Sequence, residues 1–284
     1  MVYDCFTFFN ELDILELRLN ELDEVVDFFV LVEASRTHQN NEKPFYFEEN
    51  KLRFEKFLPK IIHIKLEKYP LFIPIINPFT PWKIENYQRN AIVKGLKNCK
   101  KEDIILISDV DEIPKASIIK EYVSKGINQI YGLRMSMFLY YFNNQLIYDE
   151  GTQLSIEESK DGIWHCTALL PYYLMKQNPQ KIRKNVMRTI RRKEVYKIIS
   201  NAGWHFTYIG GVEKIINKLK SFAHSEFNNS NFTDKEVIEN KLKSGQDVLD
   251  RNVKFNVLTD LSSLPKYLQK ESILEKFKDY FIQK

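Results

Sequence analysis

The first part of the chain alternates short apolar runs with amphipathic stretches. Val2–Phe9 is apolar and β-prone, and Phe28–Val32 is a continuous apolar run of the kind found in strands buried on both faces. Asn10 offers an N-cap to the helix between them. Strand, helix and strand within 33 residues predict a βαβ unit, and therefore a parallel sheet. The apolar face of that helix, which extends to about Asp23, is Leu12, Leu15, Leu19 and Leu22.

The same alternation continues to about residue 127. Residues 48–58 are predicted as a helix, Ile61–Leu66 as a strand and Ile104–Ile107 as another buried strand. Pro114 suits the first turn of a further helix. We therefore predict the α/β class: a Rossmann-like, mostly parallel central sheet with helices on both faces. A helix before Ile104 carries its apolar face on Ile84, Tyr87, Ala91 and Leu96.

Beyond residue 128 the regular alternation is lost. Gln129–Met135, Met137–Phe142 and Ile163–Leu169 are predicted strands without regular helices between them. Helical patterns return near 179–193 and 212–222, and the Lys-rich tail from Asp234 is amphipathic.

Composition narrows the class of protein. A chain of 284 residues with 44% hydrophobic and 13% aromatic residues can fold around a full core. Cys5, Cys99 and Cys166 are too widely spaced for a disulfide framework or a paired metal site, which favours a reducing compartment. Residues 1–9 run directly into a predicted strand, and no apolar run approaches membrane-spanning length. We therefore expect a cytoplasmic protein.

The net charge of +4 is too mild to require nucleic acid, but the charges are unevenly distributed. The segment from Gly162 to Lys193 contains no Asp or Glu. Such a run is either a solvated face or a patch for phosphates or an anionic membrane surface, with peripheral membrane contact through 176–193. Its basic residues are Lys176, Lys181, Arg183, Lys184, Arg188, Arg191, Arg192 and Lys193.

The sharpest chemical signal is Asp109-Val110-Asp111-Glu112, directly after a buried strand. Alternate residues leaving a strand point the same way, so Asp109 and Asp111 can converge. In open α/β sheets, ligands bind outside the carboxyl ends of the strands. Carboxylates suit Mg²⁺ or Mn²⁺ completed by substrate phosphates, so Asp109 and Asp111 are predicted metal ligands, and Val110 is expected to contact the same ligand. An acidic helix cap or turn is the alternative reading.

Other polar residues are predicted at the same edge of the sheet. Glu33 ends the second strand, where it can accept hydrogen bonds from a base or ribose or simply face water. Asn10 and Glu11 end the first strand and are either ligand contacts or helix caps. Arg89, with Asn90 beside it, can reach a phosphate or stack on a base.

Two histidines are candidates for a further metal ligand. His205 lies in a strand-like segment and His224 in Ser221–Glu226, and imidazole tolerates Mn²⁺. A core or surface role remains the alternative for each, and His63 is interpreted as structural. Gly210-Gly211 permits positive φ and close approach of a ligand to the backbone. Asp247 and Arg251 are spaced for an i,i+4 ion pair.

These residues occur in blocks whose order resembles glycosyltransferase family 17, whose best-known members add the bisecting N-acetylglucosamine of N-glycans. The resemblance covers nearly the whole chain and is far more specific than one Asp-x-Asp. The blocks are Tyr3–Phe6, Phe9–Asp13, Leu15–Leu19, Val32–Ala34, Trp82, Gln88–Asn90, Ile107–Pro114, Gly203–Phe206, Gly210-Gly211, Ser221–Glu226, Gly245, Asp247 and Arg251.

The resemblance implies a GT-A type fold and a metal-dependent, inverting transferase. It implies a UDP-sugar donor, UDP-N-acetylglucosamine in particular, and Mn²⁺ or Mg²⁺. Inversion requires a carboxylate base, for which Glu213, Asp247 and Glu150 are the candidates. A single catalytic domain, 1–284, is then expected, with a nucleotide-sugar-binding half at 1–127, an acceptor-side half at 128–233 and a C-terminal helical extension at 234–284.

The chain departs from the animal enzymes of this family, which are anchored in the Golgi membrane. With no anchor in the sequence, it resembles a bacterial or viral member. Its acceptor is then expected to be a glycan or lipid-linked glycan, with which the basic segment is compatible.

Two alternatives from other classes remain at this stage. Haloacid-dehalogenase-type phosphatases also place Asp-x-Asp after a buried strand, but they carry Thr or Val where this chain has Ile113 followed by Pro114. A non-catalytic sugar-nucleotide-binding module would share the fold without turnover, although the acidic triplet is intact.

Overall fold

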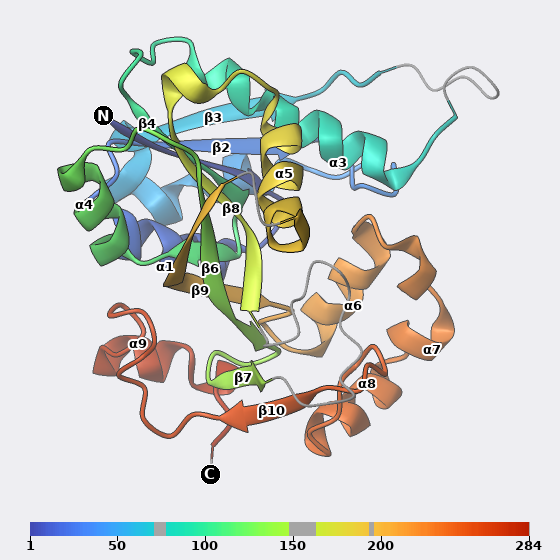
Figure 1. Cartoon of the computed structure of the whole chain (residues 1–284). Helices are drawn as coiled ribbons and strands as arrows, with labels where there is room; N and C mark the ends of the chain where they lie inside the picture. Colours follow the sequence, from blue (N-terminus) through green and yellow to red (C-terminus); the bar gives the residue numbers. More distant parts are fainter. Residues whose placement is uncertain (71–77, 148–162, 193–195, 284) are drawn as a thin grey trace.

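The computed structural model describes residues 1–70, 78–147, 163–192 and 196–283 (Figure 1). The strands are β1 (Val2–Phe8), β2 (Phe28–Ala34), β3 (Ile61–Leu66), β4 (Ile104–Asp109), β5 (Glu112–Pro114), β6 (Tyr131–Leu139), β7 (Asn144–Ile147), β8 (Ile163–Pro171), β9 (Lys197–Thr207) and β10 (Lys254–Val257). The α-helices are α1 (Leu12–Leu22), α2 (Tyr46–Glu49), α3 (Pro81–Asn90), α4 (Ala116–Lys125), α5 (Pro179–Arg192), α6 (Val212–Ser221), α7 (Ser230–Thr233), α8 (Lys235–Lys243) and α9 (Glu271–Lys276). Short 3₁₀ helices are η1 (Lys51–Lys60), η2 (Ala91–Leu96), η3 (Tyr172–Leu174), η4 (Ser225–Phe227) and η5 (Lys278–Tyr280).

One large mixed sheet organises the molecule. β3, β2, β1 and β4 are parallel neighbours in that order, as the βαβ pattern predicts. β8 then runs antiparallel to β4, followed by β6, β7 and β10. β9 lies parallel to β6 and also pairs with β5. The predicted α/β class is confirmed, with the parallel order in the first half of the chain and mixed pairing in the second.

Strand alternation divides the core between the two faces of the sheet. Phe6 and Phe8 of β1 pack with Leu15 of α1, on the face that α4 and the C-terminal segment also cover. Tyr3 and Cys5 of the same strand pack on the opposite face with η2 and α5. Figure 1 shows α3 and α5 next to each other, which their contacts confirm. β1, β2 and β4 are therefore buried on both sides, whereas β3 is the partly exposed edge strand.

A third cluster builds the lower part of the molecule. Met137 and Leu139 of β6 pack with Ile215 and Leu219 of α6 and with Ile238 of α8. Figure 1 shows α6, α7 and α8 grouped together, away from α1 and α4. This group places the end of α6 opposite the carboxyl ends of the parallel strands.

Several local predictions need correction. Pro114 ends β5 rather than opening a helix, because residues 112–114 pair with β9, and α4 begins at Ala116. The two strands predicted at 129–142 are the single strand β6, with a register irregularity between Leu133 and Met135. Residues 48–58 divide between α2 and η1. The C-terminal extension contains β10, which pairs with β7, in addition to helices.

Asn10 does not cap α1. The N-cap residue is Glu11, and no side chain caps that end of the helix. Instead, the Glu11 carboxylate accepts the backbone N–H groups of Phe9 and Asn10 at 3.2 and 3.0 Å. These bonds fix the turn before the helix, and Asn10 itself donates to Asn217 at 3.4 Å.

Candidate active site

A cavity of about 330 Å³ lies at the carboxyl ends of β1, β2 and β4. It is lined by residues that follow these strands, by α3 and α5, and by β9 and the end of α6. Among the described residues, seven Lys and Arg side chains line it against four Asp and Glu side chains. The excess of positive charge suits an anionic ligand.

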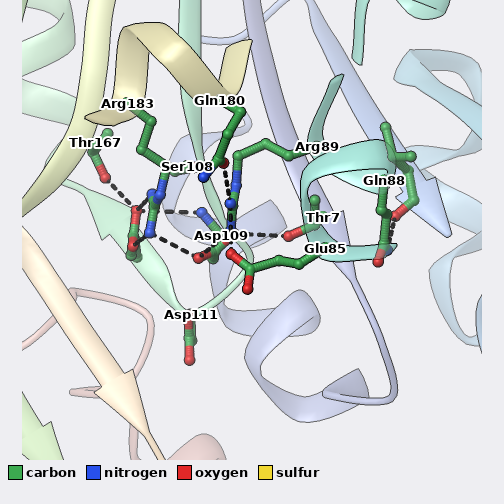
Figure 2. A network of polar contacts seen from close by, with 12 residues as sticks. Thr7, Glu85, Gln88, Arg89, Ser108, Asp109, Asp111, Thr167, Gln180 and Arg183 are labelled. Atoms are coloured by element: carbon green, nitrogen blue, oxygen red, sulfur yellow. Dashed lines mark hydrogen bonds and ion pairs between the residues drawn. The ribbon is translucent and has the colours of Figure 1, made fainter. Parts of the chain in front are cut away.

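Asp109 lies inside the cavity in a clamp of two guanidinium groups (Figure 2). Arg89 donates to its two carboxylate oxygens at 2.8 and 3.1 Å, and Arg183 donates to Oδ2 at 2.7 Å. The Thr7 hydroxyl donates to Oδ1 at 2.8 Å from the neighbouring strand. Burial raises the pKa of the Asp109 carboxyl, but Arg183 and Arg89 lower it much further, so its pKa lies well below the usual range. Asp109 is therefore a fixed anion that orients two arginines.

Strand alternation explains why Arg89 and Arg183 meet Asp109. Ile105 and Ile107 of β4 face the side of the sheet that η2 and α5 cover, and Asp109 continues that alternation. Gln88 fixes α3 against the sheet, because its Nε2 donates to the carbonyls of Phe8 and Val32 at 3.1 and 2.9 Å.

Glu112 forms a second, fully buried centre beside Asp109. Its carboxylate accepts hydrogen bonds from the Trp164 indole at 2.5 Å and from the Thr167 hydroxyl at 2.7 Å. Arg183 donates to it at 2.6 Å from Nη1 and also from Nη2. Glu112 therefore holds the guanidinium of Arg183 toward Asp109 and does not itself line the cavity.

Arg18 supports the acidic turn from the opposite face of the sheet. Its side chain is fully buried and makes two bonds to the Asp4 carboxylate, at 2.5 and 2.7 Å. Its Nη1 donates to the carbonyl oxygens of Asp109, Val110 and Glu112, at 3.0, 3.2 and 2.6 Å. One buried guanidinium thus fixes the backbone that carries Asp109 and Asp111.

Asp111 faces a different group of side chains, and Figure 2 shows its carboxylate apart from the clamp around Asp109. Its Oδ2 accepts a hydrogen bond from the Lys218 ammonium at 2.8 Å and lies 3.5 Å from His205 Nε2. Burial raises the pKa of Asp111, but Lys218 and His205 lower it, and the net pKa is below the usual range. The pKa of Lys218 is raised, because Asp111 and Glu11 outweigh its burial.

Asp111 and His205 fit part of a divalent metal site. The two side chains line the cavity, with Asp111 Oδ2 and His205 Nε2 3.5 Å apart. In the described part of the chain, no group of three or more His, Cys, Asp and Glu side chains is gathered to hold a metal. Such a pair suits a cation whose remaining ligands are water and phosphate oxygens.

The remaining predicted ligand contacts divide into two groups. Val110 and Glu11 line the cavity with Asp109, Asp111 and Arg89. Glu33, Asn10 and Asn90 do not line it. Glu33 is turned to the α1 face by strand alternation, where it accepts the N–H of Phe47 at 3.2 Å and lies 3.1 Å from His63. Asn90 accepts the N–H of Gln180 at 3.1 Å.

The predicted bases lie away from the cavity or outside the described residues. Glu213 is exposed on α6 and pairs with Lys235 at 2.8 Å. Asp247 is buried, accepts a hydrogen bond from the Tyr140 hydroxyl at 2.6 Å and forms the expected ion pair with Arg251 at 2.8 Å. Burial raises the pKa of Asp247, but Arg251 and Tyr140 lower it below its usual value. Glu150 lies outside the described residues.

His224 lines the cavity but faces aromatic side chains rather than Asp111. Its ring packs edge to face on Trp82 with the ring centroids 4.9 Å apart, and its Nδ1 lies 2.7 Å from Glu226 Oε1. Gly210 and Gly211 adopt positive φ before α6, as expected from the double glycine. In the basic segment, Arg183 and Lys184 line the cavity, whereas the side chains of Arg191 and Arg192 and all of Lys193 lie outside the described residues.

Sequence reasoning missed the roles of Arg18, Lys218 and Glu112. Arg18 gave a usable signal, since it falls among leucines on the apolar face of α1, where a charge requires a buried partner. Asp4 interrupts the apolar pattern of β1 on the same face and is that partner. Lys218 gave none, because a lysine at the border of an apolar helix face is commonly solvated.

The fold and the cavity together define an α/β protein with a strand-end site in which Asp109 and Asp111 stand among an excess of basic side chains. The sequence profile of glycosyltransferase family 17 matches residues 1–158. The chain therefore belongs to glycosyltransferase family 17.

Curated relatives carry a more specific name. Beta-1,4-mannosyl-glycoprotein 4-beta-N-acetylglucosaminyltransferase of Rattus norvegicus is 24% identical over 229 residues, covering 77% of this chain and 42% of the relative. The Homo sapiens protein of that name is also 24% identical, with equal coverage. The chain thus spans less than half the length of these relatives.

Solved structures resemble the chain only slightly. HddC from Yersinia pseudotuberculosis has 12% identity and a TM-score of 0.35, covering 70% of this chain and 89% of that chain. A putative glucose-1-phosphate thymidylyltransferase from Bacillus anthracis has 8% identity and the same TM-score, covering 70% and 85%. The described residues contain no helix that is long and apolar enough to cross a membrane.

Proposed function

We propose that this chain is a metal-dependent, inverting glycosyltransferase that moves N-acetylglucosamine from UDP-N-acetylglucosamine to a hydroxyl of a glycan or lipid-linked glycan. The observation that carries the proposal is the cavity in which Asp109 and Asp111 stand at the carboxyl end of β4 among basic side chains. Family membership and the name of the curated relatives support the reaction class and the sugar.

In this proposal the basic side chains bind the diphosphate of the donor. Arg89 and Arg183 are held by Asp109, so their positions are fixed before the ligand arrives. Among the residues that the structure describes, the Nε of buried Arg89 has no hydrogen-bond partner. Fixed positive charges that face a leaving diphosphate lower the barrier because they need no rearrangement as charge develops.

Asp111 and His205 would hold the divalent cation, with donor phosphates as further ligands. When bound, such a cation adds positive charge against the leaving diphosphate. Glu11 and Val110 would contact the donor at the end of β1 and in the acidic turn. The acceptor hydroxyl must lose its proton to a carboxylate, and Glu150 remains the candidate to be tested by substitution.

A donor screen tests the proposal. Ligands that bind the native state raise its melting temperature, so UDP-sugars with Mn²⁺ should raise that of the wild type more than GDP- or CMP-sugars do. Asp111→Ala should abolish the Mn²⁺-dependent part of the shift. If no UDP-sugar shifts the melting temperature, or if Asp111→Ala responds like the wild type, the proposal is wrong.

A further inference from the structure

Lys218 lines the cavity, but the proposed reaction gives it no role of its own. Its Nζ donates to Asp111 Oδ2 at 2.8 Å and to the Thr207 hydroxyl at 3.0 Å. The same ammonium lies 5.2 Å from the centre of the Tyr208 ring. The Lys218 side chain is 23% exposed and lines the cavity, whereas Ile215 and Leu219 of the same helix are fully buried.

The ammonium competes for the oxygen that a metal would use. Asp111 Oδ2 is the atom that lies 3.5 Å from His205 Nε2, and it is also the acceptor for Lys218. A divalent cation on that oxygen would stand within a few ångströms of the ammonium. Two cations at such a distance repel each other strongly in a site partly shielded from water.

Lysine is suited to move between two anions. Its ammonium is a compact charge on a flexible stem of four carbons, unlike the planar guanidinium groups that clamp Asp109. Phosphate oxygens of a bound donor would offer it new acceptors. Arg89 and Arg183 would instead bind phosphate from fixed positions, because each of them forms ion pairs with two carboxylates.

We propose that Lys218 is a built-in counter-ion for Asp111, which must transfer to the diphosphate of the donor before a divalent cation can bind tightly. This inference rests on the proposed function and deepens it. It requires that metal and donor strengthen each other's binding, because each removes an obstacle for the other. The free protein would then bind the metal weakly, and the two would assemble together.

The test is direct measurement of Mn²⁺ binding to the protein without nucleotide, by electron paramagnetic resonance of the free ion. Lys218→Met removes the charge and keeps the length of the side chain, so it should tighten Mn²⁺ binding by about tenfold or more. Lys218→Arg keeps the charge and should bind Mn²⁺ as weakly as the wild type. Adding UDP should strengthen Mn²⁺ binding far more in the wild type than in Lys218→Met.

Lys214→Met is the matched control. Lys214 lies one turn earlier on α6, pairs with Asp13 at 3.0 Å and does not line the cavity. Its substitution should leave Mn²⁺ binding unchanged. The circular dichroism and melting temperature of every variant establish that it is folded. If Lys218→Met does not fold, Lys218→Arg is compared with the wild type alone, and tighter Mn²⁺ binding by Lys218→Arg would contradict the proposal.

The outcomes separate the two proposals. If Lys218→Met binds Mn²⁺ no more tightly than the wild type while UDP still strengthens Mn²⁺ binding, the counter-ion role is wrong and the proposed function stands. Equal tightening by Lys214→Met would also overturn the role of Lys218. If neither the wild type nor Lys218→Met binds Mn²⁺ even with saturating UDP, both proposals fall.

Discussion

At the scale of single residues, the site depends on carboxylates that remain charged. The pKa values of Asp109 and Asp111 are both lowered in the fold, by two arginines in one case and by Lys218 and His205 in the other. Arg89, Arg183 and Lys218 would face a diphosphate, so ligand binding and local charge balance are linked at these two positions.

This charge balance predicts a loss of stability in acid. A carboxyl whose pKa is lower in the folded state stabilises the fold fully above its unfolded value of about 4, and that contribution disappears as the pH falls below it. The free energy of unfolding, measured in urea from pH 7 to pH 3, should therefore fall below about pH 4. Asp109→Asn with Asp111→Asn should show a shallower fall. An unchanged slope in the double variant would contradict these pKa shifts.

Arg18 is predicted to matter for stability and for the site. Arg18→Met leaves the buried Asp4 carboxylate without its partner, which should cost about 3 kcal/mol or more of unfolding free energy. Arg53 is a suitable control, since it pairs with Asp13 and Glu16 while remaining 30% exposed. Arg53→Met should cost about 1 kcal/mol or less. If urea unfolding gives Arg18→Met no larger loss than Arg53→Met, the buried role is wrong.

The residues that sequence could and could not assign differ in a physical way. Asp109 and Asp111 line the cavity as predicted, because their position depends on a local pattern, a buried strand followed by acidic residues. Instead of converging, they pair with different side chains, Asp109 with two arginines and Asp111 with Lys218. Their role as metal ligands stays a prediction. Glu33 lies one residue before the end of β2, and strand alternation turns its side chain to the face of the sheet away from the cavity. The contact of Lys218 with Asp111 brings α6 to the turn after β4, and the two residues are 107 positions apart in the sequence. No local pattern encodes a contact over that distance.

At the scale of elements, the contact between β5 and β9 holds the acidic turn in place. Gly203 of β9 pairs with Pro114, and a Cβ at Gly203 would stand 2.3 Å from the carbonyl oxygen of Ile113 and 2.9 Å from the Cα of Pro114. Both are backbone atoms, so they cannot move aside as the end of a side chain could. The close approach continues into the pairing of Glu112 with His205.

Gly203→Ala should therefore destabilise the protein by about 1–3 kcal/mol, because the two strands must separate. Ser200→Ala on the same strand is the control, since Ser200 is exposed. Urea unfolding monitored by circular dichroism measures both variants. Equal stability of the two would show that β5 can shift at no cost.

The predicted elements were most accurate where apolar periodicity alone decides. β1, α1, β2 and β3 were predicted nearly to their observed ends. Pro114 was misplaced because β5 has only three residues, and its pairing with β9 is a long-range contact. The single strand β6 was predicted as two strands divided at Ser136, which instead lies within the strand and pairs with β8 and β9.

At the scale of the whole molecule, the C-terminal segment closes over the N-terminal half. Leu264, Leu268, Phe277 and Phe281 belong to the same core cluster as Phe6 of β1. Polar contacts reinforce this closure, because the Tyr267 hydroxyl donates to Glu16 at 2.7 Å and the Tyr280 hydroxyl donates to Asp13 at 3.0 Å. The segment is thus part of the core that carries α1 and the acidic turn. The division of the chain at residues 127 and 233 stays a prediction.

Leu268→Ala should accordingly lower the stability of the entire protein by about 2–5 kcal/mol in one transition. Val237→Ala, at an exposed site on α8, should change it by about 0.5 kcal/mol or less. Denaturation followed both by tryptophan fluorescence and by circular dichroism distinguishes one transition from two. An early, separate loss of the C-terminal segment would contradict a shared core.

The central claim is that Asp111 belongs to the metal and diphosphate site of a glycosyltransferase. Its most direct test is the release of UDP from UDP-N-acetylglucosamine with Mn²⁺, compared between the wild type, Asp111→Asn and the surface control Glu213→Gln. We predict Mn²⁺-dependent release by the wild type and by Glu213→Gln, and a loss of at least about a hundredfold in Asp111→Asn. Equal release by the wild type and Asp111→Asn, or no release by the wild type, would contradict the claim.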